Sequence, residues 1–201
     1  MTDLTIFAPD DFKKHLRVLE NKAKFCKARL HCELGATSNY QHYVLTGNEG
    51  TGKSDAVNKI YLQMVSVSGL TNCVTKDAAT MFDFNDGFSS SMNEACQNNI
   101  LLHIMNAEQL GMKGNINPKS GLEELCNRMV KMENSVVVLS GKRSQLLELV
   151  KGHEKAKEWF SYIFHFDDLT PEYLFQYMME FVNSKNYMFD PSTETVLKDY
   201  L

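Results

Sequence analysis

Apolar residues along the chain fall into two alternating patterns, short dense clusters and longer stretches with helical spacing. The short clusters are predicted to be β-strands, at residues 43–46, 71–75, 100–105, 135–140 and 162–166. In the third and fourth clusters the apolar residues are almost continuous, which is typical of strands buried on both faces of a parallel sheet.

Between these clusters, apolar residues recur every three or four positions, as they do on one face of an amphipathic helix. Helices are predicted to begin at Pro9 and after Gly52, and to cover residues 90–97, 120–133 and 144–151. Strands that alternate with helices predict an α/β fold whose parallel sheet is covered by helices on both faces.

The end of the chain shows two further helix starts. Thr170 stands in position to cap a helix that has Pro171 as its first residue, and a second helix begins near Asp190. We therefore expect an α/β domain over residues 1–169, followed by a small helical segment over residues 170–201.

One glycine-rich segment joins the first predicted strand to the helix that follows it. It contains the complete pattern G-x-x-x-x-G-K-S/T, the signature of a phosphate-binding loop. Glycines allow backbone N–H groups to surround phosphate oxygens, and the positive end of the helix dipole adds to the attraction. In such a loop Lys53 would reach the β- and γ-phosphates, and the Ser54 hydroxyl would occupy one position on Mg²⁺. The residues predicted to bind ATP are Gly47, Asn48, Glu49, Gly50, Thr51, Gly52, Lys53 and Ser54.

The composition limits the partners and the compartment. The chain has 201 residues and a net charge of −4, so it lacks the basic excess that non-specific nucleic-acid binding requires. No apolar run approaches the roughly 20 residues of a membrane span, and the first residues do not resemble a signal peptide. Five cysteines without a C-x-x-C pair indicate reduced thiols. We expect a cytoplasmic protein that binds neither nucleic acid nor membranes.

Beyond the phosphate-binding loop, three segments fall in the order and spacing of a known family: 100–110, 136–141 and 164–174. Together with residues 43–54 they resemble the AAA+ ATPases, and within these the group of CbbX-type rubisco activases and stage V sporulation protein K-like proteins. The resemblance implies a five-stranded parallel sheet in the order 5-1-4-3-2, then a helical lid of which residues 170–201 would form only a part. It also implies ATP and Mg²⁺ as cofactors, assembly into a ring and remodelling of a protein client.

The chain departs from the family pattern at the residues that perform hydrolysis. In the family the third strand ends in Asp-Glu, where the Asp holds Mg²⁺ through water and the Glu polarises the attacking water. Here the two positions are Met105 and Asn106. A thioether does not suit a hard cation, and an amide cannot act as a general base. A frame shifted by one residue places Asn106 at the metal side, and Glu108 is the nearby carboxylate that would substitute after a rearrangement of the strand end.

Two other family positions are also changed. Trp159 stands where the family has its ring arginine, with Lys155 and Lys157 as neighbouring cations, and Ser140 or Lys142 stands at the polar sensor position. A general base contributes about 10²–10⁴-fold to a rate, and an arginine finger about 10³–10⁵-fold. Loss of both would leave the phosphate cradle and remove most of the catalysis.

Several functions are compatible with these residues. The first is an ATP-binding AAA+-like domain with weak or absent hydrolysis, a pseudo-ATPase with a regulatory or scaffolding role toward protein partners or copies of itself. The second is an active AAA+ ATPase that remodels a protein client, with Glu108 as the base. A P-loop small-molecule kinase would need a basic lid, for which Arg128, Lys142 and Arg143 are the nearby candidates. A purely structural module would not need Lys53 beside Ser54.

Overall fold

The computed structural model describes residues 8–31, 41–81, 87–111, 121–132 and 135–200. Its centre is a five-stranded parallel sheet in the order β2-β3-β4-β1-β5. The strands are β1 (Tyr43–Thr46), β2 (Asn72–Asp77), β3 (Ile100–Met105), β4 (Val136–Gly141) and β5 (Tyr162–His165). Read from the other edge, this is the order 5-1-4-3-2 that the resemblance implied, so the predicted fold class is confirmed.

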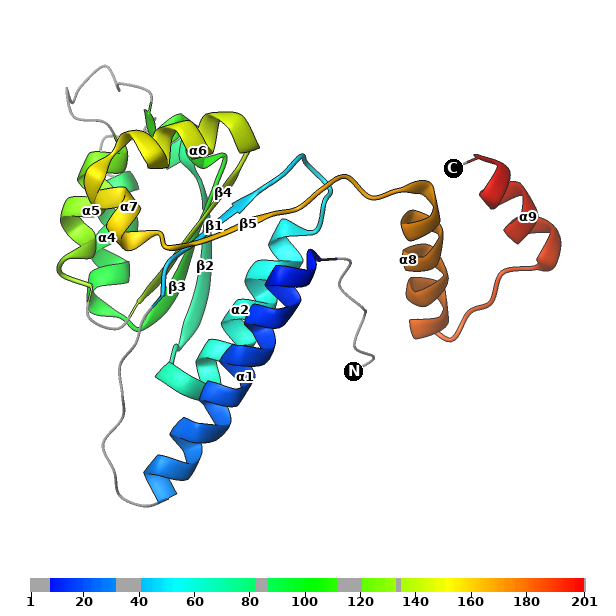
Figure 1. Ribbon diagram of the computed structural model, residues 1–201, viewed down its shortest axis with the longest axis horizontal. Helices are drawn as coiled ribbons and strands as arrows, with labels where there is room; N and C mark the ends of the chain where they lie inside the picture. The colour runs from blue at the N-terminus through cyan, green and yellow to red at the C-terminus, as the bar shows by residue number, and fades with distance from the viewer. Residues whose placement is uncertain (1–7, 32–40, 82–86, 112–120, 133–134, 201) are drawn as a thin grey trace.

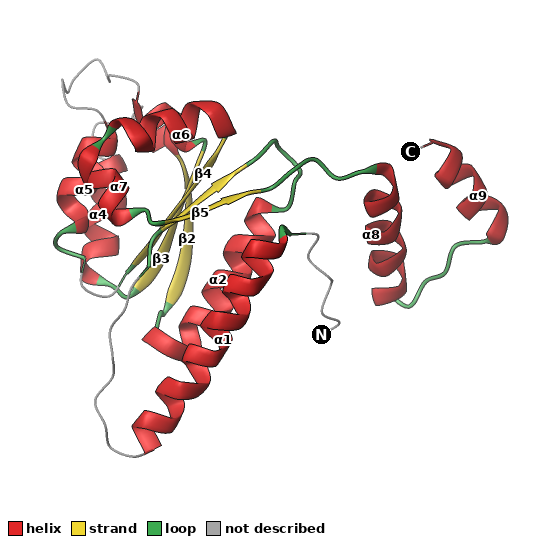
Figure 2. Ribbon diagram, in the orientation of Figure 1, coloured by secondary structure: helices red, strands yellow, loops and turns green. Residues whose placement is uncertain are grey.

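Helices cover both faces of the sheet, which makes three layers (Figures 1 and 2). Helices α1 and α2 lie on one face, and α4, α5, α6 and α7 lie on the other. The helical elements are α1 (Asp10–His31), α2 (Lys53–Ser68), α3 (Ala78–Met81), α4 (Gly87–Gln97), the 3₁₀ helix η1 (Ala107–Gly111), α5 (Gly121–Met129), α6 (Arg143–Gly152), α7 (Glu154–Trp159), α8 (Pro171–Ser184) and α9 (Pro191–Tyr200). The predicted helices are present, whereas α3, η1 and α7 were not expected.

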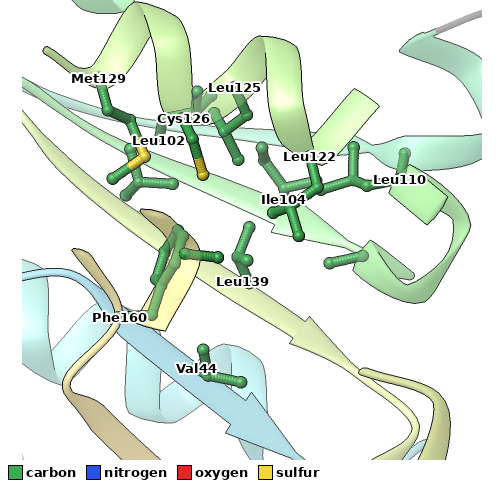
Figure 3. Packing of buried hydrophobic residues seen from close by; sticks show 14 of the residues in the cluster. Val44, Leu102, Ile104, Leu110, Leu122, Leu125, Cys126, Met129, Leu139 and Phe160 are labelled. Atoms are coloured by element: carbon green, nitrogen blue, oxygen red, sulfur yellow. The ribbon is translucent and has the colours of Figure 1, made fainter. Parts of the chain in front are cut away.

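Each face of the sheet has its own apolar core, because side chains alternate along a strand. On the face toward α5, Leu102 and Ile104 of β3 and Leu139 of β4 pack with Leu122 and Leu125 (Figure 3). Burial of each such side chain stabilises the fold by about 1.5–3 kcal/mol. These contacts fix the third and fourth strands, whose ends form part of the site.

The opposite face packs against α1 and α2. Tyr43 and Leu45 of β1 lie in one buried cluster with Phe12 of α1 and Ile60 of α2. The Phe12 ring meets that of Phe164 edge to face, with the two centroids 5.2 Å apart. Helix α2 is thereby held under the sheet, with its first turn beside the carboxyl end of β1.

Strand β1 lies between β4 and β5, and this position determines what surrounds the loop that follows it. Thr46, its last residue, is in register with Gly141 of β4 and with His165 of β5. In a parallel sheet all carboxyl ends meet at one edge, so the segments after β1, β3, β4 and β5 converge there.

Helices α8 and α9 lie apart from the sheet and its covering helices (Figure 1), and neither contains a buried residue. Thr170 caps α8 as predicted, because its side chain accepts a hydrogen bond from the Tyr173 N–H at 3.4 Å, and Pro171 is the first helical residue. The large apolar side chains exposed on this segment are Tyr173, Phe181, Tyr187, Met188, Val196 and Tyr200. Among the described helices, none combines the length and apolar character that crossing a membrane requires.

Candidate functional site

The loop between β1 and α2 has a backbone that few residues other than glycine adopt. Gly47 has φ 151° and Gly52 has φ 87°. A Cβ atom on Gly47 would also lie 2.3 Å from the carbonyl oxygen of Phe166, which is closer than any such contact allows. The loop therefore turns tightly against the segment after β5, as the three glycines of the motif predicted.

Helix α2 begins at Lys53, directly after this turn. Gly52 occupies the N-cap position, and no side chain caps the helix. The N–H groups of the first turn have no partner within the helix, and the helix dipole gives this end a partial positive charge. Both features favour an anion in front of the helix.

The Lys53 side chain folds back onto the loop. Its Nζ donates to the carbonyl oxygen of Gly47 at 2.9 Å and also to that of Asn48. Burial lowers the pKa of Lys53, and the nearby carboxylates of Glu49, Glu108 and Asp168 partly offset this shift. The ammonium is thus kept at the loop, where it can exchange carbonyl oxygens for phosphate oxygens.

A cavity of about 380 Å³ opens in front of this loop. One wall comes from the loop and α2, and the other comes from the ends of β3 and β4. The lining residues are Gly47, Glu49, Gly50, Gly52, Lys53, Ser54, Asp55, Met105, Asn106, Ser140, Gly141 and Lys142. The structure thus brings six of the eight predicted loop residues to the cavity, while Asn48 and Thr51 support the loop from behind.

These two supporting side chains have defined partners. The Thr51 hydroxyl donates to the carbonyl oxygen of Asn48 at 2.8 Å. The Asn48 Nδ2 donates to both carboxylate oxygens of Asp168, each at 2.9 Å, in the connection between β5 and α8. The nucleotide contact predicted for Asn48 stays a prediction, and its side chain links the loop to the segment that leads into α8.

The wall formed by β3 carries an asparagine in an unusual conformation. Asn106 has φ 51°, in the left-handed region that non-glycine residues rarely occupy. Its Nδ2 donates to Asp77 Oδ2 at 2.8 Å, and Asp77 Oδ1 accepts from the N–H of Ala79 at 2.8 Å. This contact holds the Asn106 side chain at the cavity, where its amide oxygen and its second N–H are not used by Asp77.

Glu108 lies in η1, after β3, and is not among the residues that line the cavity. Its Oε2 accepts from the backbone N–H of Lys142 at 3.2 Å. The same oxygen would lie 1.9 Å from a Cβ atom on Gly141, so the carboxylate occupies the space that the missing side chain leaves. It is therefore one residue removed from the cavity surface.

A row of polar side chains runs beneath the cavity. His103 of β3 lies between Thr75 of β2 and Ser140 of β4, with Nδ1 3.4 Å from the Thr75 hydroxyl and Nε2 2.8 Å from the Ser140 hydroxyl. Burial, together with the positive charge of Lys53, lowers the pKa of His103 to about 4. The imidazole is therefore neutral at pH 7.

A second, smaller cavity of about 250 Å³ lies beside the Asn48–Asp168 contact. It is lined by the start of α1 and by the connection between β5 and α8. The lining residues are Ala8, Pro9, Asp10, Lys13, Asp167, Asp168, Leu169 and Tyr173. Asp168 thus borders this cavity and also holds the phosphate loop.

Several residues at the site were not singled out by the sequence analysis. Asp77 stands at the carboxyl end of a predicted parallel strand, which is the one sequence signal that would have identified it. His103 lies in the apolar cluster that was predicted to be the third strand, and the structure shows it buried and bonded to Ser140 of the cavity wall. Trp159, in place of the ring arginine, packs against His42 with ring centroids 5.5 Å apart, so it has a structural contact.

The residues fit a phosphate group better than they fit a metal ion. Backbone N–H groups, the helix end and Lys53 suit phosphate oxygens, and Ser54 supplies one hydroxyl for Mg²⁺. The strand position across the cavity offers the Met105 thioether and the Asn106 amide, where Mg²⁺ prefers carboxylate oxygens. Among the described residues, no group of three His, Cys, Asp or Glu side chains is placed to hold a metal ion.

Comparison with known proteins identifies relatives in structure only. No family profile and no curated protein sequence matches the chain. A RuvB variant from Thermotoga maritima is similar, with a TM-score of 0.64 and 16% identity over 96% of this chain and 55% of that one. The FIGL-1 AAA domain in complex with ADP is similar with a TM-score of 0.57 and 17% identity, over 91% of this chain and 60% of that one.

These likenesses show the fold. The chain has a P-loop NTPase fold of the AAA+ type. It spans 55% and 60% of the two matched chains, and at such low identity the activities of these proteins do not transfer to it.

Proposed function

We propose that this domain binds ATP or ADP and hydrolyses ATP weakly or not at all. The single observation that supports this proposal most is the contrast between the cavity walls. The loop wall presents Gly47, the α2 end and Lys53, whereas the strand wall presents Met105 and Asn106. Binding therefore has its groups in place, and hydrolysis lacks the carboxylates that AAA+ ATPases carry at this position.

Bound nucleotide would act here as a ligand that stabilises one arrangement of the domain. A ligand at 100 times its Kd stabilises a fold by about 2.7 kcal/mol. The contact between Asn48 and Asp168 joins the phosphate loop to the connection that leads to α8. A regulatory or scaffolding role, exerted through α8 and α9 on protein partners or on copies of this chain, follows from that connection.

The wider parts of the proposal rest on the resemblance. In this proposal a nucleotide-binding domain covers residues 1–169 and a partial lid covers residues 170–201, and Mg²⁺ binds with ATP through Ser54. The chain would belong with the CbbX and stage V sporulation protein K group. The protein would be cytoplasmic and would not bind nucleic acid. The exposed aromatic side chains of α8 and α9, such as Tyr173 and Tyr200, support a protein-facing role for the lid.

The test follows labelled ATP with Mg²⁺ for hours in the presence of the protein. Free and bound nucleotide are then identified for the wild type, for Lys53→Ala and for Lys151→Ala, a control at the far end of α6. We expect intact ATP to be retained by the wild type and the control, and lost by Lys53→Ala. Steady Lys53-dependent conversion to ADP would overturn the proposed lack of hydrolysis, and no binding by the wild type would overturn the proposal as a whole.

One observation favours the alternative of an active ATPase. The Glu108 carboxylate lies directly behind Gly141, which lines the cavity. A shift of the η1 turn would bring this carboxylate toward the ligand. If Glu108 were the base, Glu108→Gln would abolish turnover, and turnover per molecule would rise with protein concentration as subunits assembled.

A further inference from the structure

The polar row of Thr75, His103 and Ser140 connects the interior of the sheet to the cavity. Thr75 and His103 are paired in register on β2 and β3, and Ser140 follows on β4. His103 is 2% exposed and Ser140 is 4% exposed, yet Ser140 contributes to the cavity lining. Buried polar side chains cost stability unless they are hydrogen-bonded to each other. These three side chains are bonded in this way, and one end of the row, Ser140, reaches the cavity.

A neutral imidazole carries one N–H donor and one bare nitrogen that accepts. With its proton on Nε2, His103 donates to Ser140 Oγ over 2.8 Å and accepts from the Thr75 hydroxyl at Nδ1. With its proton on Nδ1, it donates to Thr75 and accepts from the Ser140 hydroxyl. The two tautomers thus reverse the direction of both hydrogen bonds.

This reversal changes what Ser140 presents to the cavity. In the first case the Ser140 proton is not used by His103, so the hydroxyl can donate to a ligand. In the second case the proton points at His103, so Ser140 offers only lone pairs. Phosphate oxygens accept hydrogen bonds, and a donor to a charged oxygen is worth about twice a neutral one.

We propose that the His103 tautomer sets whether Ser140 donates into the cavity, and that a bound phosphate selects the tautomer protonated on Nε2. His103 is then a positioning residue that acts through Ser140, and Thr75 stabilises the same tautomer from the other side. This inference rests on the proposed nucleotide binding. The charged group that faces the row from α2 is Lys53, and its ammonium disfavours a second proton on the ring.

Nitrogen-15 NMR of the histidine rings tests the proposal directly, because the two ring nitrogens report the tautomer. The signals of His103 are assigned by their loss in His103→Gln. We expect saturating ADP or ATP with Mg²⁺ to shift the ring toward the Nε2-protonated form. A ring that stays protonated on Nδ1, or becomes an imidazolium when nucleotide is bound, would overturn the proposal.

Affinity measurements give a second test with matched variants. Ser140→Ala should weaken ATP binding by about ten- to a hundredfold, the range for a hydrogen bond to a charged group. His103→Leu should weaken binding to a similar degree, and the double variant should be no worse than either single variant. His103→Gln keeps an amide donor near Ser140, so it should recover most of the affinity.

A smaller pair of changes covers the case in which His103→Leu does not fold. Thr75→Val removes the donor to Nδ1, while Thr75→Ser keeps it. We expect Thr75→Val, but not Thr75→Ser, to reduce both the fraction of Nε2-protonated ring and the affinity for ATP. Equal values for both variants would count against the proposal.

The outcomes separate this inference from the function on which it rests. If Lys53-dependent binding is present but Ser140→Ala binds normally and the tautomer does not respond, only the role of His103 fails. If the wild type binds no nucleotide at millimolar concentration, the proposed function and this inference fail together.

Discussion

The two walls of the cavity differ in the kind of group that they present to the cavity. The loop wall uses backbone N–H groups, one helix end and Lys53, whereas the strand wall depends on the side chains at Met105, Asn106 and Ser140. Backbone groups persist through most substitutions, but a single codon change removes a carboxylate. Under the proposed function, phosphate binding would depend on the loop and α2, and hydrolysis would depend on the ends of β3 and β4, so substitutions in one wall would leave the other wall intact.

The largest expected effect comes from moving a carboxylate to the strand wall. The double variant Asp77→Asn with Asn106→Asp keeps one carboxylate and one amide in contact but exchanges their places. The carboxylate then lines the cavity, and Asn at 77 can still cap Ala79. We expect ATP turnover to rise by about 10²–10⁴-fold, the usual contribution of a positioned base, as measured by phosphate release.

Asn106→Asp alone is the control for this exchange. It would place two carboxylates at the 2.8 Å contact that Asn106 makes with Asp77. Like charges at such a distance raise the pKa of one of them, so the single variant should be less stable at pH 7 than at pH 5 relative to wild type. An unchanged rate in a well-folded double variant would show that more than a carboxylate is missing from this wall.

The second prediction compares one glycine from each wall. Gly47→Ala would force a Cβ atom to 2.3 Å from the backbone oxygen of Phe166 at a strained φ, whereas Gly141→Ala meets the movable end of Glu108. Strain and overpacking together should cost Gly47→Ala about 2–6 kcal/mol, and Gly141→Ala about 1 kcal/mol for one disturbed hydrogen bond. Urea unfolding of both variants measures the difference, and similar losses would contradict the structure.

The third prediction compares the acid stability contributed by buried histidines at the two ends of the strands. The pKa values of His15, His42 and His103 are each lowered from 6.5 to about 4, mainly by burial, with a smaller part from Lys22 at His15 and from Lys53 at His103. Between these pH values the unfolded chain binds protons that the folded chain does not. The stability that the three neutral histidines contribute is therefore fully present above pH 6.5, and it is lost as the pH falls toward 4.

With three such protons, the free energy of unfolding should fall by at most about 4 kcal/mol per pH unit. Urea midpoints measured from pH 7 to pH 4.5 give this slope. His42→Gln and His103→Gln should each reduce the slope by about one proton. An equal slope in the wild type and both variants would mean that carboxylates alone cause the acid sensitivity.

The smallest effect is expected at the exposed contact behind the loop. Asn48→Ala removes the hydrogen bonds to Asp168, which should cost no more than about 1 kcal/mol of stability. Protease cleavage between β5 and α8 should nevertheless become faster, because this contact tethers the connection. Asp167→Asn is the matched control, since that carboxylate faces His165 at 3.2 Å instead of the loop.

The sequence predicted the parts of this molecule that depend on local pattern. Apolar clusters identified the strands, and the loop motif identified the cavity wall that contains Lys53. The strand order followed from the resemblance, because the spacing of apolar residues does not show which strands lie side by side in the sheet. The boundary expected near residue 170 stays a prediction.

The strand wall was harder to predict because its contacts join residues far apart in the chain. Asp77 meets Asn106 across two strands, and His103 meets Ser140 in the same way. A lone histidine in an apolar run gives no sign of what lies on the next strand. Helix α7 was missed because its six residues are too short to show a helical repeat.

Strand β1 joins the phosphate loop to both of its neighbours. The Gly47 N–H donates to the Gly141 carbonyl oxygen at 3.1 Å, and the Phe166 N–H donates to the Thr46 carbonyl oxygen at 2.7 Å. A force that pulls on α8 is transmitted through residues 166–170 to β5 and, through the hydrogen bond of Phe166, to the end of β1. If the loop binds nucleotide as proposed, mechanical load on α8 and α9 should therefore change the affinity of the site.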